Sequence, residues 1–222
     1  MVKSKLFDET KHRIKRAKIF EGLLNDRHLG KFCINYNDFP EPFQKCCKSV
    51  KAIILGADPT NPRKDHLKVV FGLEKLQSPY FSSIFKNLQK LGLGLDDIYV
   101  QNLCPNYFSQ VTDENPKYEE IAGKYWLPFL KDELDAQFPC EVPVLITAWK
   151  PFVVIAPEAK AVANKKSRIY TESIVFSKNN LCRPVFAFFR GGYRKGFNGY
   201  YDIDLQEYSD YKKLIISYFH KN

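Results

Sequence analysis

Residues 50–60 read Val-Lys-Ala-Ile-Ile-Leu-Gly-Ala-Asp-Pro-Thr, so an apolar run leads directly into a turn that carries one carboxylate, Asp58. A short, nearly continuous apolar run is typical of a strand buried on both faces of a parallel sheet. In open α/β sheets, ligands bind in the crevice beyond the carboxyl ends of such strands. The pattern therefore places Asp58 where an active-site acid would lie.

Three more apolar runs have the same character, at residues 98–102, 142–147 and 184–189. Together with residues 50–55 they predict a central four-stranded parallel sheet. The second run ends at Asn102, so another polar side chain is expected at the same edge of the sheet as Asp58.

Apolar residues at helical spacing flank and separate these runs, and they predict helices over residues 8–25, 83–91, 121–138 and 205–218. Gly92 is expected to end the second helix, and Pro128 to kink the third. Residues 150–181, basic and interrupted by prolines, give no clear pattern. Because strands and helices alternate, we expect an α/β fold, a three-layer α/β/α sandwich with right-handed crossovers.

The composition is that of a single domain over residues 1–222. With 45% hydrophobic residues the chain can bury one sizeable core, and no shift in composition marks a second domain. No run is long enough to span a bilayer and the N-terminus lacks an apolar signal segment, so we expect a cytoplasmic protein. We also expect a monomer.

The formal net charge of +9 favours a polyanionic partner such as DNA, because neutralised phosphates release counterions. The alternative is an ordinary solvated surface, since many soluble proteins are equally basic. Six cysteines and four histidines form no C-x-x-C or H-E-x-x-H pattern. We therefore expect buried free thiols, no metal and no cofactor.

Phe71 lies fifteen residues after Gly56, and Asn102 ends the next apolar run. Over roughly residues 48–105 this arrangement resembles the uracil-DNA glycosylase superfamily, whose first motif reads G-Q-D-P-Y-H and is followed at a fixed distance by G-L-C-F. The resemblance implies that Asp58 orients or activates the attacking water, that Phe71 stacks on an extruded base, and that Asn102 binds the polar edge of uracil. Ala57 and Thr60 would line the same pocket.

The sequence departs from the family at two places. Thr60 stands where the family has a tyrosine that excludes the methyl group of thymine. The second family motif, H-P-S-P-L-S followed by R-G-F-F-G, corresponds to residues 188–199, which read FFRGGYRKGFNG and lack the histidine. Arg190, or the amides that follow it, would then stabilise the negative charge on the departing base. Tyr193 or Arg194 would take the place of the intercalating leucine.

The resemblance implies a DNA glycosylase that flips a nucleotide out of DNA and hydrolyses its N-glycosidic bond. Basic side chains expected to hold the phosphates are Arg63, Lys64, Lys68, Arg190, Arg194 and Lys195.

Two other functions remain open. One is a non-catalytic DNA- or nucleotide-binding protein on the same fold. The other is an unrelated α/β enzyme for a phosphorylated small molecule, although the chain has no G-x-G-x-x-G or G-K-[ST] loop. Taken singly, Thr60 could cap a turn, Phe71 could be a core aromatic, and Asn102 could bind backbone at a strand end.

Overall fold

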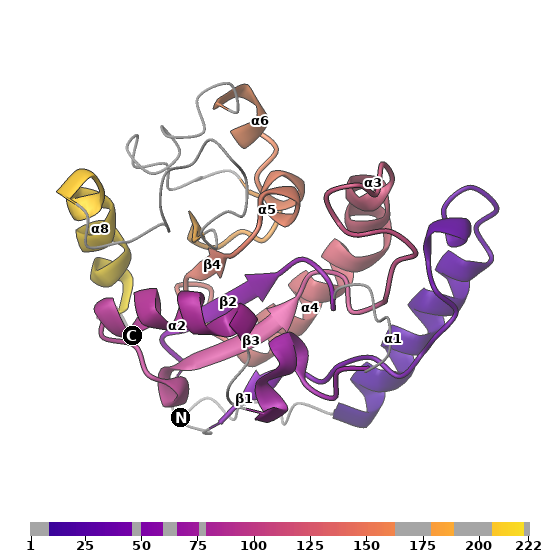
Figure 1. Ribbon diagram of the computed structural model, residues 1–222, viewed down its shortest axis with the longest axis horizontal. Helices are drawn as coiled ribbons and strands as arrows, with labels where there is room; N and C mark the ends of the chain where they lie inside the picture. The colour runs from indigo at the N-terminus through magenta and orange to yellow at the C-terminus, as the bar shows by residue number, and fades with distance from the viewer. Residues whose placement is uncertain are drawn as a thin grey trace.

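The structure, a computed structural model, describes residues 9–45, 50–59, 66–75, 79–162, 179–188 and 206–219. Its centre is a mixed, mostly parallel sheet of five strands in the order β1-β3-β2-β4-β5 (Figure 1). The strands are β1 (Phe43–Gln44), β2 (Ala52–Gly56), β3 (Ile98–Asn102), β4 (Val144–Ile146) and β5 (Val185–Ala187).

The α-helices are α1 (Glu9–Leu24), α2 (Pro79–Lys90), α3 (Tyr118–Ile121), α4 (Leu127–Gln137), α5 (Trp149–Ile155), α6 (Ala159–Val162) and α8 (Ser209–Phe219). Short 3-10 segments are η1 (Gly30–Phe32), η2 (Val70–Lys75), η3 (Leu95–Asp97) and η6 (Gln206–Tyr208), and η4 (Ala122–Trp126) is a π-helical turn. No helix within these residues is long and apolar enough to cross a membrane.

The prediction of four parallel strands is confirmed, but the predicted total of four strands is wrong, because the sheet has five. β1 adds a fifth, antiparallel edge strand, with Phe43 opposite Val100 and Gln44 opposite Tyr99. Two residues are too few to show the alternation by which a half-buried strand is recognised. The observed β2 is shifted toward Gly56, and β4 and β5 are shorter than their apolar runs.

The parallel strands β2 and β3 are in register, so Gly56 lies opposite Asn102. Parallel partners direct their side chains to the same face of a sheet. On that face, Phe186 of β5 contacts Tyr211 of α8, with ring centroids 5.9 Å apart. Figure 1 shows α2 and α8 on this side of the sheet.

The opposite face is covered by α4, where the rings of Tyr99 and Phe138 lie 4.9 Å apart. α5 contacts α3 and the π-helical turn that precedes α4, and so belongs to the same layer. Helices thus cover both faces of the sheet, compatible with a three-layer arrangement. α5 was not expected from the sequence because residues 151–155 are all buried and show no amphipathic period.

The expected end of the second helix at Gly92 is confirmed. Gly92, at φ +77°, follows α2, and the next amide, of Leu93, donates to the carbonyl of Leu88 at 2.9 Å. This is the 6→1 bond of a Schellman motif. Pro128, where a kink was expected, lies in the first turn of α4, directly after a π-helical turn whose last residue, Trp126, is buried in the core. A proline in the first turn of a helix needs no amide partner.

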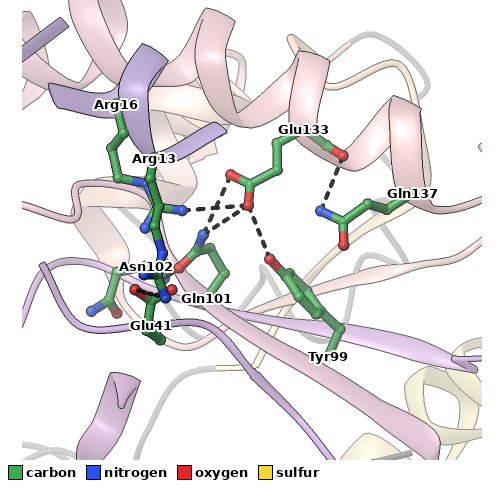
Figure 2. Close-up of polar contacts among 8 residues, drawn as sticks. All are labelled: Arg13, Arg16, Glu41, Tyr99, Gln101, Asn102, Glu133 and Gln137. Atoms are coloured by element: carbon green, nitrogen blue, oxygen red, sulfur yellow. Dashed lines mark hydrogen bonds and ion pairs between the residues drawn. The ribbon is translucent and has the colours of Figure 1, made fainter. Parts of the chain in front are cut away.

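A buried polar network joins α1, α4 and β3 (Figure 2). The carboxylate of Glu133, 1% exposed, accepts hydrogen bonds from the Tyr99 hydroxyl at 3.2 Å and from the Gln101 amide at 3.4 Å. Arg16, 4% exposed, completes it as an ion pair at 3.4 Å. Burial, with the charge of Glu133 nearby, raises the pKa of Tyr99 well above its ordinary value.

Removing the carboxylate should destabilise the fold strongly. Glu133→Leu leaves a buried arginine without its ion-pair partner, and we expect the free energy of unfolding to fall by about 3–5 kcal/mol. The double variant Arg16→Met/Glu133→Leu should lose less than the sum of the two single changes. Urea unfolding monitored by circular dichroism measures all three.

The matched control is the exposed ion pair between Lys15 and Asp132, which joins the same two helices at 2.7 Å. Asp132→Asn should cost less than about 1 kcal/mol, because water screens this pair. Equal losses from Glu133→Leu and Asp132→Asn would contradict the importance of the buried network.

Candidate functional site

The carboxyl ends of β2 and β3 stay together beyond the last strand residues. The amide of Leu103 donates to the carbonyl of Gly56 at 3.0 Å, and the amide of Cys104 donates to the carbonyl of Ala57 at 2.9 Å. β2 and β4 are also neighbours, and the helices that follow them, α2 and α5, cover opposite faces. In open α/β sheets, ligands bind where the connections of neighbouring strands diverge in this way. Asp58, two residues after the end of β2, is buried.

Phe71 and Asn102 meet directly over Gly56. A Cβ atom added to Gly56 would lie 2.3 Å from Cε1 of Phe71 and 2.4 Å from Oδ1 of Asn102. Any side chain at this position would collide with both residues. Glycine is therefore required here by the close approach of an aromatic ring and an amide, two residues before Asp58.

The side-chain amide of Asn102 is the most unusual group at the site. The residue is 1% exposed, yet neither Oδ1 nor Nδ2 has a hydrogen-bond partner among the residues that the structure describes. Figure 2 shows this amide directed away from Glu133 and its network. Its backbone amide donates instead to Oε1 of Gln101 at 3.2 Å. Buried amide groups are nearly always paired, so this donor and acceptor point to a bound ligand or water.

Phe71 is held in an unfavourable backbone conformation, φ 60° and ψ 9°, and Gly72 follows at φ 68°. A bulky residue in the left-handed region costs about 1–3 kcal/mol and persists only where its surroundings enforce it. The flanking chain supplies that constraint: the amide of Val70 donates to the carbonyl of Glu41, and the amide of Glu41 donates to the carbonyl of Lys68, both at 2.9 Å. Arg13 of α1 pairs with Glu41 at 2.9 Å.

Asp58 is contacted by a loop that the sequence did not single out. The hydroxyl of Thr112 donates to the carboxylate of Asp58. Nearby, the hydroxyl of Tyr118 donates to the carbonyl of Ala57 at 3.0 Å. Thr112 and Tyr118 lie in and after an irregular connection between β3 and α3, where no periodic pattern marks a functional position.

Lys150, at the start of α5, is also new to the site. Its ammonium group donates to the carbonyl of Thr112, and to that of Asn115 at 2.7 Å. Burial lowers the pKa of Lys150, and the negative charges of Asp113, Glu119 and Asp58 oppose that shift. The residue lies in the basic stretch, residues 150–181, that shows no clear pattern in the sequence.

The cysteines differ from the expectation. Cys104 is buried, but Cys140 and Cys182 are exposed free thiols. Burial, with the charge of Asp58 adding to it, raises the pKa of Cys104 well above its ordinary value, which disfavours the reactive thiolate form. Within the residues that the structure describes, no cluster of three or more His, Cys, Asp or Glu side chains could hold a metal ion.

Of the site residues expected from the sequence, the structure brings Ala57, Asp58, Phe71 and Asn102 to one edge of the sheet. Lys68 is exposed on the segment that leads to Phe71. The remaining ones lie outside the described residues: Thr60, Arg63, Lys64, Arg190, Tyr193, Arg194 and Lys195. The chain matches no protein-family model and no curated protein.

The close contact at Gly56 can be tested by filling it. Gly56→Ala should force Phe71 or Asn102 away from the strand end, and we expect a loss of about 1–3 kcal/mol of stability. Urea unfolding measures the loss, and amide chemical shifts of residues 70–72 report the displacement.

Gly22 of α1 serves as control, since nothing lies within 4 Å of a Cβ added there. Gly22→Ala should leave stability unchanged or raise it by up to about 1 kcal/mol. A Gly56→Ala protein as stable as wild type would contradict the contact.

Proposed function

We propose that the protein is a DNA glycosylase-like enzyme that binds an extruded base at Asn102 and Phe71 and hydrolyses its N-glycosidic bond with Asp58. The observation that carries the proposal is the buried, unpartnered amide of Asn102 next to the ring of Phe71. The resemblance of residues 48–105 to uracil-DNA glycosylases supports the same assignment.

The chemistry of Asn102 suits a nucleobase. A side-chain amide offers one acceptor and two donors in a plane, which complements the N–H and C=O groups along the edge of uracil or a related base. An aromatic ring beside it supplies a stacking surface for a planar ligand. A site built to pair such an edge rejects ligands that lack it, because the amide would otherwise stay buried without partners.

Asp58 supplies the group needed for hydrolysis. In the proposed reaction its carboxylate orients water toward C1′ of the sugar and accepts the proton as the C–O bond forms. The electron pair of the C1′–N bond leaves with the base, which departs as an anion and is then protonated. A donor must stabilise that anion, and Arg190 is our candidate on sequence grounds.

DNA is the proposed partner. The protein's net charge of +9 and the exposed Lys68, on the segment that leads to Phe71, support this proposal. We also propose that the five-stranded sheet and its helices form the three-layer α/β/α sandwich of the glycosylases. A second candidate is a binding protein that retains the pocket without cleavage. It is favoured by the absence of a histidine in residues 188–199.

An assay of base release distinguishes the glycosylase from the non-catalytic binding protein. Oligonucleotides carrying uracil, hypoxanthine, xanthine or a G·T mismatch are incubated with the protein and treated with alkali to cleave abasic sites. The wild-type protein should release the base from at least one of the four substrates, which alkali then cleaves at the abasic site. Asp58→Asn should slow release by orders of magnitude with nearly unchanged DNA affinity, since the carboxylate acts in the transition state.

Asp96→Asn is the matched control, because Asp96 lies in η3, directly before β3 and thus at the opposite end of that strand from Asn102. It should release base at the wild-type rate. Arg190→Ala should be slower than wild type by a factor on the order of a hundred if this side chain stabilises the departing base. Absence of release from all four substrates would favour the binding protein.

DNA affinity should depend strongly on salt in either case. Each phosphate neutralised by a lysine or arginine releases counterions, so the logarithm of the association constant should fall linearly with that of salt concentration. We expect the DNA affinity to fall on the order of tenfold or more between about 50 and 200 mM salt. Fluorescence anisotropy with a labelled duplex measures this affinity. Affinity that is constant over that interval would argue against DNA.

A further inference from the structure

The Asp58 carboxylate is contacted by Thr112, and Thr112 is contacted in turn by Lys150. Thr112, which donates its hydroxyl to Asp58, is 54 positions away in the sequence. Lys150, which donates to the carbonyl of Thr112, is another 38 positions on. The three residues follow β2, β3 and β4 respectively, so the contact joins the connections that leave three neighbouring strands.

The loop that carries Thr112 is internally fixed. The amides of Glu114 and Asn115 donate to the carbonyl of Val111 at 2.9 and 3.0 Å, and the buried side chain of Asn115 accepts from the amide of Lys117 at 2.9 Å. Lys150 ties this loop to α5 through two carbonyls. Its ammonium is thereby directed at the backbone of the loop, which makes it a support for the loop.

We propose that Thr112 and Lys150 are positioning residues for Asp58: Lys150 holds the 111–117 loop in place, and the Thr112 hydroxyl fixes the direction of the Asp58 carboxylate. The inference rests on the proposed function, in which that carboxylate orients the attacking water. A carboxylate with free rotation would spend less time in the productive geometry, and a displacement of about 1 Å can cost on the order of a hundredfold in rate.

The variants Thr112→Val, Thr112→Ser and Lys150→Met separate positioning from folding. Valine keeps the shape of threonine without the hydroxyl, and serine restores the hydroxyl. Single-turnover base release should be about 10- to 100-fold slower in Thr112→Val, close to wild type in Thr112→Ser, and intermediate in Lys150→Met. DNA affinity and thermal midpoint should stay close to wild type in both Thr112 variants.

Ser109→Ala is the matched control. Ser109 lies in the same connection, and its hydroxyl donates to the carbonyl of Phe32 at 3.2 Å, away from Asp58. It should release base at the wild-type rate. Equal rates for Thr112→Val and wild type, or an equal loss in Thr112→Ser and Thr112→Val, would overturn the proposal.

A second measurement does not depend on catalysis. The side-chain carboxyl ¹³C resonance of Asp58, identified by its absence in Asp58→Asn, should move in Thr112→Val and return in Thr112→Ser. If wild type releases no base, the proposed function fails, while this pattern still supports positioning. A resonance that is unchanged in Thr112→Val overturns positioning whatever the activity.

Discussion

The close approach at Gly56 is the constraint on which the candidate site depends. β2 and β3 are paired in register to their last residues, so the glycine lies opposite Asn102. Because Gly56 has no side chain, the ring of Phe71 can enter the space above the strand end and meet the Asn102 amide there. The strained backbone of Phe71 is enforced by its surroundings, because Glu41 makes hydrogen bonds with Lys68 and Val70 and so holds the chain directly before it.

The polar side chains on the two faces of β3 differ in their hydrogen bonding. On one face Asn102 keeps its amide without a partner, and on the other Gln101 joins Glu133 and Arg16 in a buried network. Gln101 links the two, since it also accepts the backbone amide of Asn102. The network thus anchors the strand end from the α4 side of the sheet.

Much of the fold follows from local pattern. The four parallel strands, and a second helix that ends just before Gly92, were expected from apolar spacing and from the backbone freedom of glycine. β1 and α5 were missed because two residues have no period and a helix buried on all sides shows no amphipathic face. The exposed Cys140 and Cys182 likewise differ from the buried thiols expected from their residue type.

The sequence by itself determined that Asp58 and Asn102 lie at the carboxyl ends of neighbouring parallel strands, because strand ends and turns are encoded by residues near one another. Phe71 was expected beside them only from the resemblance to a known family. Tertiary structure alone decided that the Asn102 amide is buried with no partner in the described part of the chain, and that Thr112 and Lys150 meet near Asp58. Such contacts join irregular loops far apart in the chain. They depend on where the crossovers place those loops, which leaves no periodic trace in the sequence.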